Sequence, residues 1–237
     1  MKITGLQKMT LLDFPGKVAC TVFLQGCNFR CPFCHNSDLL GPESDQHISK
    51  DALLDFLKKR RGLLDGVCIT GGEPTLQPDL KELIADIKAL GFAVKLDTNG
   101  AKPEVLKDLV GAGLLDYVAM DIKNSPSRYA ETAGLPRFPL EKVEESIRFL
   151  IAGALPFEFR TTVVEEFHDD TAMEEIADWL AFLMPGKKLE HYFLQPFVDR
   201  DSVLQTGLHA PNPAALQHFS KLLEPIAKNI CIRGADA

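Results

Sequence analysis

Three cysteines lie close together near the N-terminus, in the stretch GCNFRCPFCHN at residues 26–36. Cys27, Cys31 and Cys34 are separated by three and then two residues. Thiolates on one short loop are typical ligands of an iron–sulfur cluster or a zinc ion, because both prefer soft sulfur donors. A tetrahedral site takes four ligands. The nature of the fourth ligand is therefore the first question that this sequence poses.

The remaining candidates for a fourth protein ligand fit poorly. His35 directly follows Cys34, and adjacent residues have difficulty reaching one ion together. Cys20 and Cys68 lie in apolar stretches, where a free cysteine packs as a small hydrophobic residue, and Cys231 is near the C-terminus. A second CxxC pair, which would complete a zinc module, is missing from the sequence. We predict a four-iron cluster with one open iron, while a zinc-binding interaction domain and an electron carrier stay as alternatives.

Composition sets the broad class of the protein. The chain has 237 residues, of which 46% are hydrophobic and 25% charged, which is typical of a globular protein with a large core. The N-terminal stretch lacks the apolar core of a signal peptide, and no apolar run is long enough to span a bilayer, so a cytoplasmic protein without a membrane contact is expected. In a reducing cytosol, clustered cysteines favour metal binding over disulfides. The net charge of −7 argues against a nucleic-acid partner.

The order of apolar and amphipathic segments predicts the fold class. Short runs rich in β-branched residues alternate with segments of helical period, which indicates a parallel sheet covered by helices, either doubly wound or curled into a full or partial barrel. We expect one domain over residues 1–237, with a cluster loop at 25–38. The expected strands are Val18–Leu24, Val67–Thr70, Ala93–Thr98, Tyr117–Asp121, Phe157–Val163, His191–Leu194 and, more weakly, Asn229–Arg233. The expected helices are Ser49–Arg60, Asp79–Leu90, Pro103–Val110, Leu140–Ala152, Thr171–Leu183 and Pro213–Ile226, with Ser49 as an N-cap and Gly91 as a C-terminal stop.

Polar and glycine-rich turns follow the expected strands. The cluster loop comes after the first strand, TGGEPT (residues 70–75) after the second, DTNG (97–100) after the third and MDIK (120–123) after the fourth. Arg160 lies on the fifth. Because ligands bind at the carboxyl ends of strands in both α/β architectures, we expect these turns to converge on one site.

These motifs together carry a family resemblance. Cys27, Cys31 and Cys34 match the CxxxCxxC motif of the radical S-adenosylmethionine (SAM) superfamily. With DFPGK at residues 13–17 and the TGGEPT, DTNG and MDIK turns, nearly the whole chain resembles the glycyl-radical-enzyme activases, and is nearest to the long form of the anaerobic ribonucleoside-triphosphate reductase activating proteins, which are related to pyruvate formate-lyase activase.

The resemblance implies a fold, cofactors and a reaction. The fold is a partial (β/α)6 TIM-like barrel of the radical SAM type, and the open iron of a 4Fe–4S cluster is taken by the amino and carboxylate groups of SAM. Reductive cleavage of SAM gives a 5′-deoxyadenosyl radical, which generates a glycyl radical on a partner enzyme. The implied partners are anaerobic ribonucleotide reductase and a flavodoxin- or ferredoxin-like electron donor. A pyruvate formate-lyase-type activase, or a small-molecule enzyme such as 7-carboxy-7-deazaguanine synthase, is the alternative.

The family's residue roles carry over by position. Gly71, Gly72 and Glu73 match the GGE motif that receives the methionyl amino group, and Lys123 is placed to meet the methionyl carboxylate. Phe33 lies where an aromatic residue packs against the adenine. The full set of expected cofactor-binding residues is Phe33, His35, Gly71, Gly72, Glu73, Asp97, Asn99, Asp121, Lys123 and Arg160; Asn36 completes the CHN ending, and Asp97, Thr98 and Asp121 match a monovalent-cation site.

Three departures from the family pattern limit this transfer. Phe14 stands where a glycine is usual in the DGPG motif, and Val198 stands where pyruvate formate-lyase activase has a histidine touching the ribose. That contact is absent or is made by Gln195 or His191. We expect the altered DFPG loop (residues 13–16, with Phe14) and Val198 to lie on the side from which a partner's glycine loop comes in. Residues 36–70 hold no further cysteine cluster, which makes the substrates of activases with a ferredoxin-like insert less probable.

Overall fold

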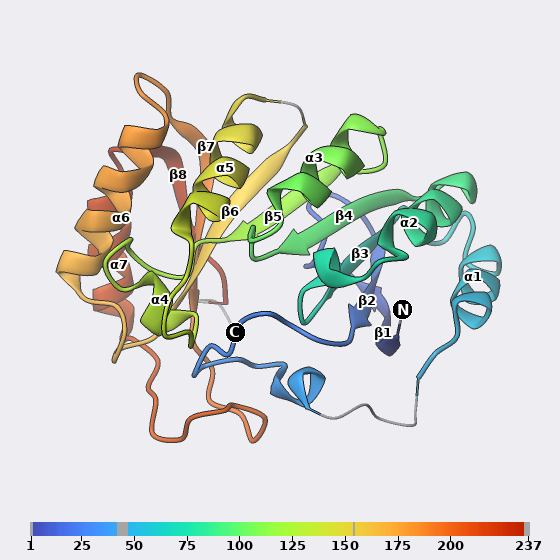
Figure 1. The fold of residues 1–237 in the computed structure, drawn as a ribbon, viewed down its shortest axis with the longest axis horizontal. Helices are drawn as coiled ribbons and strands as arrows, with labels where there is room; N and C mark the ends of the chain where they lie inside the picture. Colours follow the sequence, from blue (N-terminus) through green and yellow to red (C-terminus); the bar gives the residue numbers. More distant parts are fainter. Residues whose placement is uncertain (1, 42–46, 154, 235–237) are drawn as a thin grey trace.

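The computed structural model describes residues 2–41, 47–153 and 155–234, and its centre is one eight-stranded sheet. The strands follow one another in sequence order across the sheet, from β1 to β8 (Figure 1). Neighbours from β2 to β8 pair in parallel, whereas β1 runs antiparallel to β2. The strands are β1 (Ile3–Thr10), β2 (Ala19–Leu24), β3 (Gly66–Gly71), β4 (Ala93–Thr98), β5 (Tyr117–Asp121), β6 (Phe157–Val163), β7 (Leu189–Pro196) and β8 (Ala227–Ile232).

Amphipathic helices cover the outer face of this curved sheet (Figure 1). Their apolar faces are buried, as in α2, where Leu80, Leu83, Ile84 and Ile87 follow the helical period. The helices are α1 (Lys50–Lys58), α2 (Leu80–Ala89), α3 (Pro103–Gly111), α4 (Tyr129–Thr132), α5 (Leu140–Ile151), α6 (Asp170–Leu183) and α7 (Pro213–Leu223), with short 3-10 turns η1 (Ser37–Leu40) and η2 (Pro74–Leu76).

Helix ends follow the predicted capping residues. The Ser49 hydroxyl accepts a hydrogen bond of 3.1 Å from the Ala52 backbone N–H, which confirms it as the N-cap of α1. Gly91 follows α2 with φ +92°, the left-handed conformation that favours glycine after a helix. Both signals were correct because they depend on local backbone chemistry.

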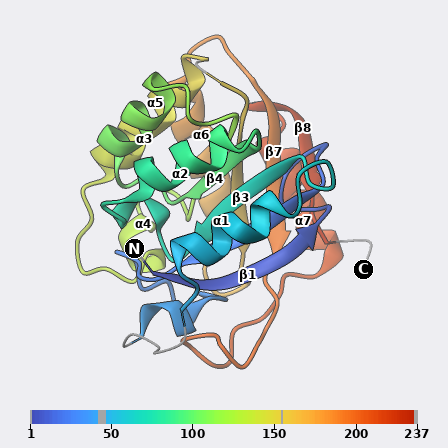
Figure 2. The ribbon, with the colours of Figure 1, turned by 90° about the vertical axis from the view of Figure 1, so that its right-hand side faces the viewer.

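The partial barrel is confirmed. Six strand–helix units follow in order, from β2/α1 to β7/α7, and the predicted bounds agree with the observed ones to within three residues. In the described residues no pairing joins β1 to β8, so the sheet is curved but open; Figure 2 shows β1 along one of its edges. The sequence prediction missed β1, because most of its residues are exposed or half-buried and give no apolar run. The four-residue helix α4 was missed as well.

Alternating residues of the parallel strands face the inside of the barrel, and several of them are charged. Lys95 and Asp97 on β4 and Glu158 on β6 are buried. Because side chains alternate along a strand, Lys95 and Asp97 lie on the same face of β4. The inner wall of the barrel is therefore charged at β4 and β6, which suits the binding of charged ligands.

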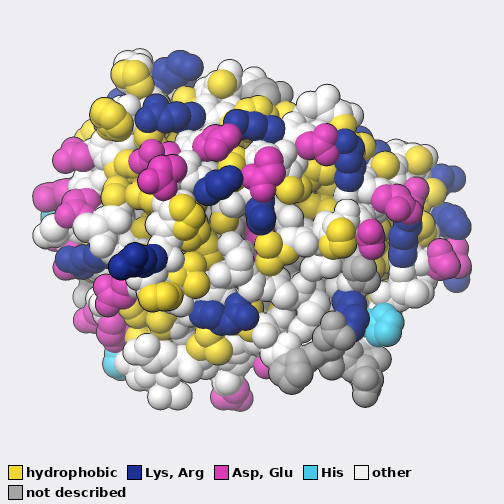
Figure 3. Space-filling view, in the orientation of Figure 1, with side chains coloured by type: hydrophobic (Ala, Val, Ile, Leu, Met, Phe, Trp, Pro, Cys, Tyr) yellow, Lys and Arg dark blue, Asp and Glu magenta, His cyan; other side chains and the backbone are white. Residues whose placement is uncertain are grey.

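Charges of both signs are mixed on the outer face of the helices. In the view of Figure 3, Lys and Arg side chains are interspersed with Asp and Glu, and pairs such as Lys81–Asp108 and Lys107–Glu145 bridge neighbouring helices. Within the described part of the chain, no helix combines the length and the apolar character that crossing a bilayer would require.

Candidate cofactor site inside the barrel

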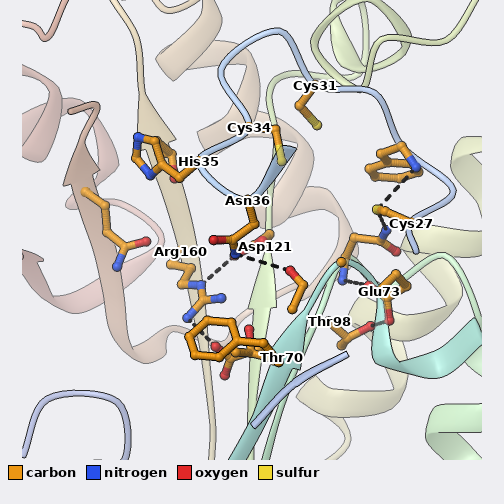
Figure 4. A pocket seen from close by; sticks show the side chains of 18 of the residues that line it. Cys27, Cys31, Cys34, His35, Asn36, Thr70, Glu73, Thr98, Asp121 and Arg160 are labelled. Carbon is orange, nitrogen blue, oxygen red and sulfur yellow. Dashed lines mark hydrogen bonds and ion pairs between the residues drawn. The ribbon is translucent and has the colours of Figure 1, made fainter. Parts of the chain in front are cut away.

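One cavity of about 510 Å³ opens where the strands end, and every site residue expected from the sequence lines it. The cluster loop lies on one side, and the turns after β3, β4 and β5 lie on the other (Figure 4). The lining residues are Gln7, Asp13, Thr21, Phe23, Cys27, Phe29, Cys31, Phe33, Cys34, His35, Asn36, Thr70, Gly71, Gly72, Glu73, Asp97, Thr98, Asn99, Asp121, Lys123, Arg160, Thr162, Gln195 and Arg200. The expected convergence of the turns is therefore present.

The cluster loop has no helix or strand of its own up to Asn36, and neighbouring backbone holds it in place. Gly26 N–H donates to Leu39 O at 2.9 Å, Glu73 N–H donates to Gly26 O at 2.7 Å, and Arg30 N–H donates to Ala133 O at 2.8 Å. These bonds tie the loop to η1, to the turn after β3 and to the end of α4. Backbone contacts of the chain itself thus define the position of the loop.

Two glycines allow this close approach of backbone to backbone. A Cβ atom on Gly72 would lie 2.0 Å from Gly26 O, and one on Gly134 would lie 2.0 Å from Arg30 O. Gly134 also has φ +67°, which a residue with a side chain adopts rarely. Any other residue at either position would push the cluster loop out of place.

The three cysteines suit a multi-iron cluster. Their sulfur atoms face one space from three points of the loop (Figure 4). Three soft sulfur donors that face one space are the protein ligands that an iron–sulfur cluster prefers. Burial raises the pKa of Cys27 to about 12 and of Cys31 to about 11, so these thiols need a nearby metal to become thiolates.

The Glu73 carboxylate is held by four hydrogen bonds. Its Oε1 accepts hydrogen bonds from Thr75 N–H (3.1 Å), Thr75 Oγ1 (2.5 Å) and Thr98 Oγ1 (2.8 Å), and its Oε2 accepts one from Asn99 N–H (2.7 Å). Burial raises the pKa of Glu73 even though these donors oppose the rise. Glu73 thus fixes the end of β4 against the turn after β3, and Oε2 keeps acceptor capacity toward the cavity.

The residues around the third cysteine form an aromatic wall. Phe33 is buried, with its ring centre 5.9 Å from that of Phe167 and 6.4 Å from that of His168. His35 stacks on Phe197 with ring centres 5.4 Å apart, and burial lowers its pKa. An aromatic wall of this kind suits the packing of a flat ring such as adenine.

The CHN ending connects the loop to two other elements. Asn36 Nδ2 donates to Gly71 O at 3.3 Å, and the Val198 backbone N–H donates to His35 Nε2 at 3.4 Å. Gln195 lines the cavity, whereas His191 is exposed and does not. Of the two residues considered as replacements for the missing ribose contact, Gln195 is the one in reach of a ligand.

Five charged side chains on β4, β5 and β6, or directly after them, form a continuous chain of ion pairs, which we call the charge ladder. Lys95 Nζ contacts Asp97 Oδ1, and Asp97 Oδ2 lies 3.1 Å from Arg160 Nη1. Arg160 Nε donates to Asp121 Oδ1 at 2.5 Å, and Lys123 Nζ donates to Asp121 Oδ2 at 2.8 Å. Burial alone would raise the pKa of each aspartate, but the cations beside them hold the pKa of both Asp97 and Asp121 below the usual value.

The ladder bears directly on the expected cation site. All four carboxylate oxygens of Asp97 and Asp121 contact a side-chain cation of the chain itself, and Thr98 Oγ1 donates to Glu73. As placed, these residues do not fit an additional monovalent cation.

Phe14 lies elsewhere than expected. Its side chain is 2% exposed, its ring lies 2.9 Å from a Cβ built on Gly66 at the start of β3, and its ring centre is 6.1 Å from that of Tyr117 at the start of β5. Phe14 therefore closes the amino end of the barrel, opposite the cluster loop, and the expectation that it borders the partner's side is wrong. An apolar ring in place of glycine is drawn into the core, while Asp13 keeps its place in the cavity wall.

Several cavity residues were not foreseen. Lys95, in the middle of a strand expected to be buried, was the available signal for a charged interior, because an unpaired lysine is almost never fully buried. Thr21, Thr162 and Arg200 gave no such signal, since threonine is common in strands and Arg200 lies in a polar loop.

Comparison with known proteins agrees with this geometry. The family model described as "Radical SAM superfamily" matches residues 21–180. A protein of Methanocaldococcus jannaschii, provisionally named as a glycyl-radical enzyme activating enzyme, is 32% identical over 98% of this chain and 95% of its own length. The pyruvate formate-lyase-activating enzyme of Clostridium pasteurianum is 33% identical over 52% of each chain. The crystal structure of a radical SAM methyltransferase from Sphaerobacter thermophilus shares the fold, with a TM-score of 0.72 at 16% identity, covering 96% of this chain and 70% of that one.

Members of this superfamily use a 4Fe–4S cluster and SAM, and the residues of the cavity fit both. Three thiols face one space (Figure 4), and a carboxylate and an ammonium, those of Glu73 and Lys123, line the same cavity. The assignment depends on sequence as well as on fold. The family model matches most of the chain, and the relative from Methanocaldococcus jannaschii aligns along nearly its whole length. The chain belongs to the radical SAM superfamily and, within it, to the glycyl-radical enzyme activating enzymes.

Proposed function

We propose that this activating enzyme generates the glycyl radical of an anaerobic ribonucleoside-triphosphate reductase. When bound, the cluster and SAM supply the reductive cleavage of SAM and the removal of a hydrogen atom from the partner's glycine. The observation that narrows the choice of partner is the short connection between the cluster loop and β3. Its described parts are η1 and α1, and the sequence there adds no cysteine cluster before Cys68. This leaves the reductase and pyruvate formate-lyase as the leading substrates.

The cavity residues then take complementary roles. Cys27, Cys31 and Cys34 hold the cluster. The turn at Gly71–Glu73 receives the amino group of SAM, because Glu73 Oε2 accepts one hydrogen bond, from Asn99 N–H, and can accept another. Lys123 receives the carboxylate, since its ammonium is fixed by Asp121 and lies in the cavity wall. Phe33 packs beside the adenine, and Gln195 contacts the ribose.

The segment after β7 gives the site a cover. The Ser202 hydroxyl donates to His35 O at 2.7 Å, Gln205 N–H donates to Pro32 O at 3.0 Å, and Ser37 Oγ donates to Ser202 O. In Figure 1 this segment and the cluster loop cross the same end of the barrel. By covering the loop, residues 202–205 help to keep water from the reacting atoms, which such chemistry needs.

The test is an anaerobic mixing experiment with the reductase encoded in the same genome, a chemical reductant or a flavodoxin- or ferredoxin-like donor, and SAM. The expected result is the doublet of a glycyl radical in the electron paramagnetic resonance spectrum of the reductase. Cys31→Ala gives none, and a reductase whose radical glycine is replaced by alanine gives none with the wild-type activase.

Two other outcomes would contradict this choice of partner. A doublet on pyruvate formate-lyase but not on the reductase would keep the chemistry and replace the partner. Cleavage of SAM to 5′-deoxyadenosine without a doublet on either enzyme would favour a small-molecule substrate.

A further inference from the structure

Lys95 is buried inside the barrel in a position that ordinary folding does not explain. It is 1% exposed, and it lies in the middle of β4 on the same face as Asp97. Its Nζ contacts Asp97 Oδ1 and lies 3.8 Å from Cys68 Sγ, and Cys68 is its register partner on β3. A buried ammonium is costly unless its partners are fixed, so a lysine here calls for a specific reason.

The surroundings of the Lys95 ammonium resemble those of a bound monovalent cation. Its partners are a carboxylate oxygen of Asp97, on the same strand β4, and the sulfur atom of Cys68, on the neighbouring strand β3. An ammonium group is a compact point charge, as potassium and ammonium ions are, whereas the guanidinium of Arg160 is a planar fork that bridges two carboxylates. Lys95 is therefore placed as a monovalent cation tethered to the backbone.

The sum of charges in the ladder supports this interpretation. Two carboxylates, Asp97 and Asp121, alternate with three cations, Lys95, Arg160 and Lys123, so the ladder has a net charge of +1. One further cation would raise that to +2 in a buried place, where like charges repel strongly. A cofactor carboxylate would instead bring the ladder to neutrality. The charge of the ladder thus disfavours a further cation and favours the binding of an anion.

We propose that Lys95 serves as a built-in counter-ion for Asp97, so that this enzyme binds SAM without a free monovalent cation. Lys95 acts through Asp97 and is a positioning residue. The inference rests on the assignment of the cavity to SAM, and it is independent of which glycyl radical enzyme is the partner.

The charges persist at neutral pH. Burial opposes the charge on Lys95, but the Asp97 carboxylate holds the pKa of its ammonium above the usual value. Burial raises the pKa of the Cys68 thiol well above normal, so this thiol stays a neutral neighbour. Two further titratable groups lie close by: the Asp13 carboxylate accepts a hydrogen bond from Thr21 Oγ1 at 2.5 Å, and Tyr117 OH donates to Glu158 Oε2 at 3.0 Å. Arg160 completes the surroundings of Asp97.

The first test uses the wild-type enzyme with its cluster reconstituted. The dissociation constant of SAM is measured in potassium chloride and in choline chloride at equal ionic strength, because choline is too large for an ion site of this size. The expected constants agree within about twofold. The melting temperature of the cluster-free chain is expected to be the same in both salts. A tenfold or so weaker affinity in choline would overturn the proposal.

The second test is chemical rescue. Lys95→Ala leaves a space beside Asp97, so SAM binding in choline is expected to weaken by about tenfold or more and to recover when ammonium or potassium chloride is added. In Lys95→Met the longer side chain fills that space, so the loss is expected without recovery. Lys107→Ala, which removes an exposed lysine paired with Glu145 on the outer face, is the matched control and is expected to bind SAM as wild type does.

A crystallographic measurement keeps the proposal falsifiable if the Lys95 variants do not fold. Wild-type crystals are soaked in thallium(I), a potassium substitute with strong anomalous scattering. No thallium is expected between Asp97 and Asp121, and a thallium peak there would overturn the proposal. Because none of these readouts involves a protein partner, their failure is distinct from a failure to activate the reductase.

Discussion

The cluster loop and the charge ladder border the same cavity but are held in place by opposite means. The loop, residues 26–36, depends on backbone hydrogen bonds and on two glycines that let backbones touch. The ladder depends on side-chain charges that the parallel register brings together, since Asp121 is the register partner of Arg160. The loop is therefore sensitive to added volume, whereas the ladder is sensitive to lost charge.

The two regions also differ in where their information lies along the chain. The ligands of the loop are seven residues apart from first to last, so their spacing is visible in one short stretch. The ladder joins residues from 95 to 160, and no local pattern marks them as neighbours. Glu73 and His168 connect the two regions. Substitutions in the loop, in the ladder and at these junctions should thus give different failures.

The largest expected effect comes from Cys31→Ala. Anaerobic reconstitution of the wild-type chain is expected to give about four irons per chain, and the variant to give almost none, because the cluster loses one of three protein ligands. Iron and sulfide analysis with visible absorption checks this result. The matched control is Cys20→Ala, which removes a buried thiol of β2 outside the cavity and should keep the cluster while losing about 1 to 2 kcal/mol of stability. Stoichiometric zinc instead of iron would contradict the cluster.

Gly72→Ala tests whether the loop depends on close backbone contact. A methyl group here would lie 2.0 Å from Gly26 O, so we expect the free energy of unfolding to fall by about 3 kcal/mol and iron uptake to drop. Denaturant titration of the cluster-free chain and iron analysis provide the measurement. Gly111→Ala, at the end of α3 with no atom within 4 Å of the added Cβ, is the control and should be neutral or stabilising by about 0.5 kcal/mol. Equal behaviour of the two variants would show that the loop adapts to added volume.

The sequence predicted the frame and the cavity better than it predicted the contacts within it. The alternation of strands and helices is set by local patterns, and the carboxyl ends of parallel strands must meet, so the turns could be placed together without coordinates. The side chain of Phe14 could not be placed, because its burial depends on packing against Gly66 at the start of β3 and Tyr117 at the start of β5, which are both distant in sequence. The ladder was missed because ion pairing depends on register, which the sequence does not show.

Glu73→Gln is the test at the first junction. The substitution keeps the shape of the side chain, but it removes the negative charge and places an amide NH₂ group where an oxygen accepted hydrogen bonds from backbone N–H groups. We therefore expect the affinity for SAM to fall by about ten- to a hundredfold, or about 1.5 to 3 kcal/mol. Titration of the reduced cluster with SAM, followed by electron paramagnetic resonance, is the measurement. Glu141→Gln on the exposed side of α5 is the control. Unchanged affinity in Glu73→Gln, with the cluster intact, would show that Glu73 serves the fold and not the cofactor.

His168→Gln tests the second junction and gives the smallest effect, visible at acid pH. The Val164 N–H donates to His168 Nδ1 at 3.1 Å, so Nε2 carries the proton and donates to Lys123 O at 3.0 Å. Burial lowers the pKa of His168 from 6.5 to about 4. The unfolded chain therefore binds more protons than the folded chain between these values, and the folded state loses stability as the pH falls.

For one histidine with this shift, linkage predicts a loss of about 2 kcal/mol between about pH 7 and about pH 5. Glutamine can keep the donor bond to Lys123 O but does not titrate, so His168→Gln should remove that part of the slope. Other groups titrate alike in both proteins and cancel in the difference. Urea titrations of the cluster-free wild type and variant at the two pH values measure it. If the free energy of unfolding fell equally with pH in the wild type and the variant, His168 would be charged in the folded chain. Our assignment of a neutral imidazole between Phe33 and Lys123 would then be wrong.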